Sequence, residues 1–246
     1  MNPAKGFTPY PVSTIGYDTK NPRWEVVDNY TMSHSHPASR PNASALQNTL
    51  AASEAAELPD ISVSPAQAKF MALMLRMLNV THALEVGTLG GYSAIWLASE
   101  NPQLHVTTVE YDARFVEVAR KNIEHAGLLE RIEVINATGF DALALLKEEV
   151  LRGDRPRFGF VFIDADKPNS WNYFNMAADM CQSKAAICVD NVVRDGRVAD
   201  ADDQHPHILG GRLVIENAGK DPRVDTAVVQ TVGCKGYDGF LWAVVN

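Results

Sequence analysis

Cysteines and long apolar runs are scarce in this sequence. Its 246 residues include three cysteines, Cys181, Cys188 and Cys234. Their odd number and lack of close pairing argue against a disulfide framework and favour reduced side chains. No stretch reaches the roughly 18 continuous apolar residues that a membrane span needs, and the N-terminus carries neither a secretory hydrophobic region nor an Arg-rich presequence. We therefore expect a cytoplasmic protein that does not enter a membrane.

Basic residues are also in the minority. Lysines and arginines number 22 against 30 aspartates and glutamates, which gives a net charge of -8. Nucleic acids and anionic membranes select basic surfaces, so neither is expected as a partner. The 46% hydrophobic and 21% charged content fits one globular domain. A small or metal-neutralised ligand suits this charge better.

Regular patterns are missing from most of the first 45 residues, which are rich in Pro, Ser, Asn and Gly. We expect a mostly irregular arm here, with a short periodic piece around residues 24–32. His34 and His36 could form a metal pair within this arm. No cysteine or acidic ligand accompanies them, which favours a solvated loop instead.

Two helical patterns follow the arm, over residues 42–57 and 65–78. The second pattern places a set of large apolar side chains on one face: Phe70, Leu73, Met74 and Met77. We expect these helices to cover the sheet or a dimer partner. The chain is thus divided into an N-terminal arm with helices, residues 1–60, and a main domain, residues 61–246.

From residue 82 onward, short apolar runs alternate with amphipathic segments. The strand-like runs are residues 83–86, 105–109, 132–135, 158–163 and 185–189. Helical patterns follow each of the first four runs. This alternation predicts an α/β fold in which parallel strands, joined by helical crossovers, form a doubly wound sheet.

The last two apolar runs lie close together in the sequence. Residues 224–232 and 240–245 are separated only by residues 233–239. So short a link predicts an antiparallel hairpin, because parallel strands need a longer crossover. A parallel sheet closed by one antiparallel hairpin is the seven-stranded, Rossmann-like arrangement typical of class I methyltransferases rather than of dehydrogenases.

A glycine-rich turn follows the first strand. It reads Glu85-Val86-Gly87-Thr88-Leu89-Gly90-Gly91-Tyr92-Ser93 and opens a helix expected at Ala94. Glycines at such a turn let a ligand approach the backbone, and a helix N-terminus offers free N–H groups to an anion. The glycine spacing does not fit the G-x-G-x-x-G of dinucleotide sites, which disfavours an NAD(P)-dependent oxidoreductase. A turn that serves only compact packing is the alternative.

Two further strand ends point to a nucleoside. Glu110 follows the second strand about 20 residues beyond the glycines, where an acid can bind ribose hydroxyls. The third strand ends in Asn136-Ala137-Thr138-Gly139, where an adenine ring would lie. Three strand ends that converge on one adenosine-sized ligand predict a nucleoside cofactor.

Acidic residues follow the fourth and fifth strands. The fourth runs into Asp164-Ala165-Asp166-Lys167 and the fifth into Asp190-Asn191. Adjacent strand ends meet at the carboxyl edge of the sheet, where ligands bind in open α/β folds. Two carboxylates and an amide suit Mg²⁺ better than Zn²⁺, because no His or Cys stands beside them. Taken singly, Asp164 or Asp166 could cap a helix, and Asp190-Asn191 could be an ordinary turn.

From about Ser64 to the C-terminus the chain resembles the cation-dependent small-molecule O-methyltransferases, the group of caffeoyl-CoA and catechol O-methyltransferases. The resemblance rests on the Glu-x-Gly-x-x-x-Gly-Tyr-Ser motif at residues 85–93 and on the two acidic strand ends. It implies S-adenosylmethionine as cofactor. The residues that would bind it are Val63, Glu85, Gly87, Thr88, Ser93, Glu110, Gly139, Asp164 and Asp166.

The resemblance also implies a divalent cation, with Mg²⁺ as the first choice, bound by Asp164, Asp190 and Asn191. Lys167 would be the catalytic base, and a solvated surface lysine is the alternative. A dication and a sulfonium beside Lys167 would favour its neutral amine. Two adjacent hydroxyls would chelate the cation, Lys167 would remove one proton, and the phenolate would attack the methyl group in line.

The expected acceptor is a small phenolic molecule with two adjacent hydroxyls. Residues 192–207 form a polar insertion that resembles a substrate-selecting loop. Plant caffeoyl-CoA enzymes carry Asn-Thr-Leu-Trp-Asn where this chain has Asn191-Val192-Val193-Arg194-Asp195. The difference disfavours a CoA thioester and favours free catechols, flavonoids or other polyphenols. Asp195 matches a substrate-binding position of that group with a different residue type.

Four aromatic side chains are candidates to stack on the acceptor ring or to pack in the core or a subunit interface: Trp171, Tyr173, Tyr237 and Trp242. Family likeness implies a homodimer. The alternative from another functional class is a non-catalytic protein that binds S-adenosylmethionine and keeps only the fold.

Overall fold

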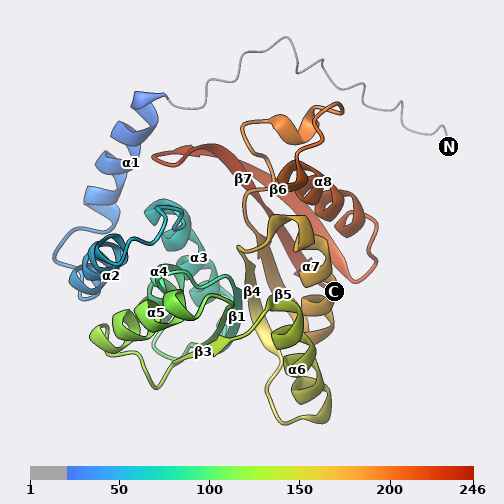
Figure 1. The fold of residues 1–246 in the computed structure, drawn as a ribbon, viewed down its shortest axis with the longest axis horizontal. Helices are drawn as coiled ribbons and strands as arrows, with labels where there is room; N and C mark the ends of the chain where they lie inside the picture. Colours follow the sequence, from blue (N-terminus) through green and yellow to red (C-terminus); the bar gives the residue numbers. More distant parts are fainter. Residues whose placement is uncertain (1–20) are drawn as a thin grey trace.

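The computed structural model describes residues 21–246, which form a mixed sheet between two layers of helices (Figure 1). The sheet has seven strands in the order β3-β2-β1-β4-β5-β7-β6. The strands are β1 (His82–Val86), β2 (His105–Glu110), β3 (Ile132–Asn136), β4 (Phe158–Ile163), β5 (Cys181–Val189), β6 (Val224–Gly233) and β7 (Gly236–Val245). Strands β1 to β5 pair in parallel, whereas β7 is antiparallel to both β5 and β6. The predicted seven-stranded, Rossmann-like sheet is confirmed.

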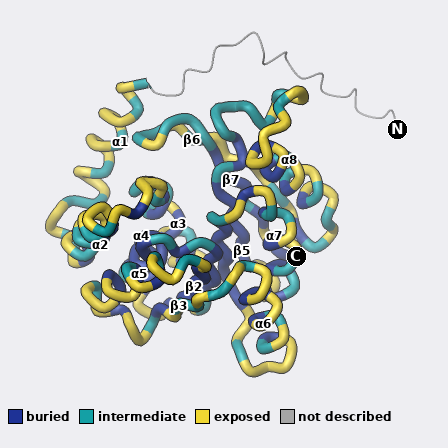
Figure 2. Tube along the Cα trace, in the orientation of Figure 1, coloured by how far each residue is buried: buried dark blue, intermediate teal, exposed yellow. Residues whose placement is uncertain are grey.

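Helices cover both faces of the sheet. One face carries α2 (Ala43–Ala55), α3 (Pro65–Met77), α4 (Tyr92–Glu100) and α5 (Ala113–His125), and the other carries α6 (Gly139–Arg152), α7 (Ser170–Met180) and α8 (Pro206–Ala218). Strand β4 shows why its sequence is apolar throughout. Phe160 and Phe162 pack with the first helix layer, while Val161 and Ile163 pack with the second. Buried residues therefore concentrate along the central strands (Figure 2).

Helix α1 (Pro22–Ser35) covers the short periodic piece that was expected around residues 24–32 and extends it by a few residues at each end, into the part of the arm that was expected to be irregular. The helix begins because the side chain of Asn21 accepts a hydrogen bond from the Arg23 amide at 3.1 Å and Pro22 takes the first helical position. None of its residues is buried. Without a buried apolar stripe, the ends of this helix are marked by its cap rather than by apolar periodicity.

His36, just after α1, does not lie in a solvated loop. Its ring packs on that of Trp96 with the centroids 4.3 Å apart, and its Nδ1 lies 3.8 Å from Glu100 Oε1. His34 bonds within α1 through its Nδ1, 2.8 Å from the Tyr30 carbonyl oxygen. The two histidines therefore serve local packing rather than one shared site.

The buried face of α3 differs from the predicted one. Its buried side chains are Ala68, Met71, Ala72 and Leu75, whereas Phe70, Leu73 and Met77 are exposed by 39%, 43% and 65%. The buried face thus carries its own large apolar residues, Met71 and Leu75, at helical spacing, so periodicity alone did not decide between the two faces. The homodimer that such exposed apolar residues would suit stays a prediction.

Several element bounds also differ from expectation. Strand β5 begins at Cys181 instead of 185, and α4 begins at Tyr92 instead of Ala94. The predicted link 233–239 shrinks to a two-residue turn, because polar residues at its ends pair across the hairpin, such as Tyr237 with Val232. Helix α8 was not predicted. Within residues 21–246, no helix combines the length and apolarity needed to cross a bilayer.

Candidate active site

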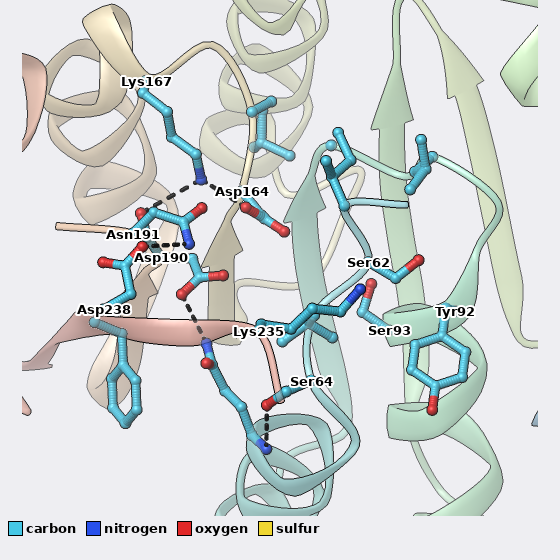
Figure 3. A pocket seen from close by; sticks show the side chains of 18 of the residues that line it. Ser62, Ser64, Tyr92, Ser93, Asp164, Lys167, Asp190, Asn191, Lys235 and Asp238 are labelled. Atoms are coloured by element: carbon cyan, nitrogen blue, oxygen red, sulfur yellow. Dashed lines mark hydrogen bonds and ion pairs between the residues drawn. The ribbon is translucent and has the colours of Figure 1, made fainter. Parts of the chain in front are cut away.

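A cavity of about 1210 Å³ opens at the carboxyl ends of the parallel strands. Its two ends are named here by their residues. The glycine end consists of Gly87, Thr88, Ser93, Glu110 and Gly139. The acidic end consists of Asp164, Lys167, Asp190 and Asn191, which face one another in Figure 3. Such a volume holds a nucleoside together with a small second molecule.

The glycine end is shaped by the turn between β1 and α4. Gly87 has a φ of +105°, and a Cβ at this position would lie 2.7 Å from the Asp164 carbonyl oxygen, so only glycine fits. The Leu89 amide donates to Glu110 Oε2 at 3.0 Å, and Thr88 Oγ1 lies 2.6 Å from Thr108 Oγ1. Glu110 therefore holds the turn from the end of the neighbouring strand.

A second carboxyl group lies beneath this turn. Glu85 is fully buried and is not among the residues that line the cavity. Its Oε2 accepts a hydrogen bond from Thr108 Oγ1 at 2.6 Å, and its Oε1 has no partner among the described residues. Burial raises the pKa of Glu85 to about 7, although the Ser93 and Thr108 hydroxyls oppose that shift. An unpartnered carboxylate oxygen suits the ammonium group of an amino-acid ligand.

The far side of the glycine end is closed by α6 and α7. Gly139 begins α6, and a Cβ there would lie 2.7 Å from the Tyr173 ring. Asp166 accepts hydrogen bonds from the Tyr173 hydroxyl at 2.9 Å and from Asn169 Nδ2 at 2.7 Å. Neither Asp164 nor Asp166 makes a capping bond to α7, which begins at Ser170. Their helix-cap alternative is therefore not what the structure contains.

At the acidic end, two carboxylates and a lysine lie together. Lys167 Nζ donates to Asp164 Oδ1 at 2.5 Å and to the Asp190 carbonyl oxygen at 3.3 Å. Gln67, from α3, donates to Asp190 Oδ1 at 2.8 Å. Burial, then the charge of Asp164, raises the pKa of Asp190 to about 6 against the opposing charge of Lys167. Carboxylates held this closely need positive charge beside them.

A sequence model of the O-methyltransferase family matches residues 35–239 of this chain. The chain belongs to the O-methyltransferase family. It is 49% identical to O-methyltransferase imqG of Aspergillus flavus over 92% of this chain and 93% of that relative. It is 43% identical to a catechol O-methyltransferase of Mycobacterium tuberculosis over 82% of this chain and 89% of that relative.

A solved structure agrees with this assignment. The O-methyltransferase from Bacillus cereus, in complex with S-adenosylhomocysteine, superposes with a TM-score of 0.84 at 40% identity, over 91% of this chain and 99% of that one. The protein is therefore an S-adenosylmethionine-dependent O-methyltransferase.

Most residues predicted for the cofactor line the cavity of this O-methyltransferase. They are Val63, Gly87, Thr88, Ser93, Glu110, Gly139, Asp164 and Asp166. Glu85 lies behind them. Asp195, the predicted substrate residue, does not line the cavity, and its amide donates to the Tyr237 carbonyl oxygen at 3.1 Å. Its neighbour Arg194 does line the cavity.

Of the aromatic side chains that were candidates to stack on the acceptor ring, one lines the cavity and others pack elsewhere. Tyr173 lines the cavity. Trp171 stacks on Phe174 with the ring centroids 5.7 Å apart, and Trp242 packs at 5.8 Å from Phe160. Phe70 and Phe240 also line the cavity, although neither was among the candidates to stack on the acceptor ring.

The residues of the acidic end fit a divalent cation. The described residues contain no group of three or more His, Cys, Asp or Glu side chains suited to a metal ion, so the candidate set is Asp164, Asp190 and the amide of Asn191. The Asn191 Nδ2 donates to Asp238 Oδ2 at 3.0 Å, which leaves its carbonyl oxygen available as a ligand. Three oxygen ligands of this kind suit Mg²⁺.

Asp238 is the residue that sequence reasoning missed at this site. It lies on β7, and its Oδ1 accepts hydrogen bonds from the amides of Val193 and Arg194 at 3.1 and 2.8 Å. Its Oδ2 accepts from Asn191. One carboxylate thus fixes both a candidate cation ligand and the start of the loop beyond it. The only available signal was an acid flanked by glycine in a predicted link, which resembles any turn.

Proposed function

We propose that this O-methyltransferase moves the methyl group of S-adenosylmethionine to one hydroxyl of a vicinal diphenol, with a divalent cation at Asp164, Asp190 and Asn191. The observation that carries the proposal is the acidic end of the cavity, where the buried Asp190, the half-buried Asp164 and Lys167 lie together beside Asn191 (Figure 3). The relative from Mycobacterium tuberculosis that is named catechol O-methyltransferase supports the acceptor class.

The glycine end would hold the methyl donor. The Glu110 carboxylate is positioned for ribose hydroxyls, and the unpartnered Oε1 of Glu85 offers a negative group below the turn. Ser93 belongs to the first turn of α4 and Gly139 begins α6. These groups bind and orient the donor, so that its methyl group would point toward the acidic end.

Lys167 is proposed as the proton acceptor. Its Nζ lies between Asp164 and the Asp190 backbone, and Lys167 is buried, so bulk water has little access to it. A cation bound at this end supplies Lewis-acid chemistry and lowers the pKa of a nearby hydroxyl group. Proton transfer to Lys167 requires the neutral amine form of its side chain. Lys167 Nζ can then take the phenol proton while the oxygen forms a bond to the methyl carbon and the carbon–sulfur bond breaks.

The position of both ends in one cavity would also accelerate the reaction by bringing the donor and the acceptor together. A phenol oxygen and a methyl carbon held within one enclosure react as an intramolecular pair, which avoids most of the entropic cost of encounter. Phe70 and Phe240, which line the cavity and lie with their ring centroids 5.8 Å apart, offer apolar surface to the acceptor ring. This surface suits flavonoids and other polyphenols as well as catechol.

Methyl transfer to a panel of catechols, flavonoids and caffeoyl-CoA, with Mg²⁺ and with EDTA, tests the proposal. Transfer to vicinal diphenols that stops in EDTA and returns with Mg²⁺ is the expected result. Full activity in EDTA would contradict the need for a divalent cation. Transfer to caffeoyl-CoA alone would mean that the acceptor is a CoA thioester and not a free diphenol. A matched pair of catechol and resorcinol, in which the hydroxyls are not adjacent, tests the need for chelation. Cofactor binding without transfer to any phenol would favour a non-catalytic protein.

A further inference from the structure

The cavity has three lysine or arginine side chains within the described residues, and they are not equivalent. Lys167 pairs with Asp164 at 2.5 Å, and Lys235, from the β6-β7 turn, pairs with Asp60 at 2.5 Å. Arg194 has no salt bridge and no side-chain hydrogen bond to any described residue. Its Nε is buried without a partner. A buried guanidinium nitrogen with an unused donor is costly unless a ligand satisfies it.

The backbone holds Arg194 in place. Its φ of +50° is in the left-handed region, which a bulky residue rarely adopts without support. The support is Asp238, whose Oδ1 accepts from the Arg194 amide at 2.8 Å. Because the other oxygen of the same carboxylate binds Asn191, Arg194 is fixed relative to the proposed cation ligands. Strain that persists in this way is common where a side chain must be aimed.

Asp238 links Arg194 to the acidic end, because its carboxylate accepts hydrogen bonds from both the Arg194 amide and Asn191 Nδ2. His207, another cavity residue, has its pKa lowered by burial first and then by the charges of Arg194, His205 and Lys167, while Asp166 opposes them. Arg194 and Lys167 therefore both act on the same side chain. The charge of Arg194 thus reaches the region where the acceptor would bind, beyond the groups proposed to hold its hydroxyls.

We infer that Arg194 selects acceptors that carry a carboxylate, so that the preferred substrates are dihydroxyaromatic acids rather than neutral catechols. This inference rests on the proposed function, because it needs a vicinal diphenol at the acidic end. A guanidinium binds a carboxylate through two parallel hydrogen bonds, which makes arginine more selective than lysine. The catechol hydroxyls would occupy the acidic end, and the carboxylate would take the free donors of Arg194.

Binding measurements test this without requiring turnover. Protein loaded with S-adenosylhomocysteine and Mg²⁺ is titrated calorimetrically with 3,4-dihydroxybenzoate and 3,4-dihydroxycinnamate, and with the neutral amide of each. The two acids differ in length, which allows for the distance between ring and guanidinium. The wild-type protein should bind at least one acid about tenfold or more tightly than its amide. Arg194→Gln should remove that difference and leave amide binding unchanged, whereas Arg194→Lys should keep part of it.

Arg197→Gln is the matched control, because Arg197 lies in the same loop, pairs with Asp203 at 2.7 Å and does not line the cavity. It should bind the acids as the wild-type protein does. Equal binding of acids and amides by the wild-type protein would overturn the inference, as would a loss of both in Arg194→Gln. If Arg194→Gln weakened the binding of caffeoyl-CoA alone, the arginine would be a ligand of the CoA phosphates, and the inference that it binds a carboxylate would be wrong.

Methyl transfer to the same ligands separates this inference from the proposed function. Acid-selective binding that disappears in Arg194→Gln, without methyl transfer to any diphenol, would support Arg194 and contradict the proposed reaction. Methyl transfer to acids and amides with equal kcat/KM, together with equal binding, would support the reaction and overturn the selectivity. With both correct, Arg194→Gln raises KM for the acids and leaves kcat near the wild-type value.

Discussion

The glycine end and the acidic end of the cavity are assembled in different ways. At the glycine end, Glu110 and Leu89 bond across 21 residues of sequence, within one strand-helix-strand unit. At the acidic end, Gln67 and Asp190 bond across 123 residues, and Asn191 and Asp238 across 47. The glycine-rich turn is therefore held within one βαβ unit, to which α6 adds Gly139, whereas the acidic end depends on contacts from α3 and β7 to the residues that follow β5. The donor site can then persist when the acceptor site is damaged.

The largest expected effect comes from the acidic end. Asp190→Asn keeps the shape of the side chain and removes the charge that a cation would need. Because Lewis-acid stabilisation contributes several kcal/mol and each 1.36 kcal/mol is a tenfold change in rate, we expect turnover of a diphenol to fall about 1,000-fold or more. Affinity for S-adenosylhomocysteine, measured by calorimetry, should stay at the wild-type value.

Asp154→Asn is the control for this variant, since Asp154 is exposed and pairs with Arg152 away from the cavity. It should leave both turnover and cofactor affinity unchanged. A parallel loss of cofactor binding in Asp190→Asn would mean that the two ends are one unit and would remove the basis of the comparison.

A smaller effect is expected at the glycine end, where a substitution should weaken cofactor binding and leave turnover at saturating cofactor nearly unchanged. The Glu110 carboxylate accepts hydrogen bonds from three backbone amides, those of Thr88, Leu89 and Asp112. Hydrogen bonds to a charged group contribute about 1.5–3 kcal/mol each. Glu110→Gln should therefore weaken S-adenosylhomocysteine binding about 10- to 100-fold. With saturating S-adenosylmethionine, kcat and the concentration of Mg²⁺ that gives half-maximal rate should change little.

The exposed Glu130 supplies the matched control, and Glu130→Gln should bind the cofactor as the wild-type protein does. If Glu110→Gln instead lowered kcat at saturating cofactor as strongly as it lowered affinity, the turn would also be shaping the acidic end. Gly87, whose Cβ would meet the Asp164 carbonyl oxygen at 2.7 Å, is the point of contact through which that could occur.

The same difference explains how much the sequence could predict. The existence of the strands, the glycine turn and Glu110 could be predicted from local patterns, because apolar periodicity and a strand-to-helix turn involve neighbouring residues. Asp238 could not be assigned, because its role depends on the pairing of β7 with β5 and on the amides that β7 brings within reach. No local signal reports such a pairing.

The sequence also did not show whether Arg194 or Asp195 would reach the cavity. Both have left-handed φ values, +50° and +57°, a local conformation that no sequence pattern indicated. Arg194 lines the cavity, and Asp195 does not. Sequence comparison favoured Asp195 because it aligns with a substrate-binding position. In the same way, both faces of α3 carry large apolar residues, and the sequence did not show which face would be buried.

The smallest predicted effect is a change with pH in the free energy of unfolding, to which Glu85 and Asp190 contribute different amounts. The pKa of Glu85 is about 7, above its ordinary value of 4.5, because the group is buried. The folded protein thus binds this proton more tightly than the unfolded chain does between those values. The resulting stability is fully present below about pH 4.5 and is lost as the pH rises through about 7. As the pH rises from 5.5 to 6.5, the contribution of Glu85 to the free energy of unfolding should fall by about 1 kcal/mol.

Urea unfolding at these two pH values, in EDTA and without cofactor, measures the change. Glu85→Gln should remove about 1 kcal/mol of it, and Asp190→Asn a smaller share, because the pKa of Asp190 is raised only to about 6. Glu117→Gln is the control: Glu117 is exposed on α5 and Lys121 lowers its pKa, so the variant should keep the wild-type difference. A difference that Glu85→Gln leaves intact would mean that the protonation of Glu85 does not change between these two pH values. Glu85 would then offer the donor's ammonium group the same charge across this range, and the pH dependence would belong to the acidic end alone.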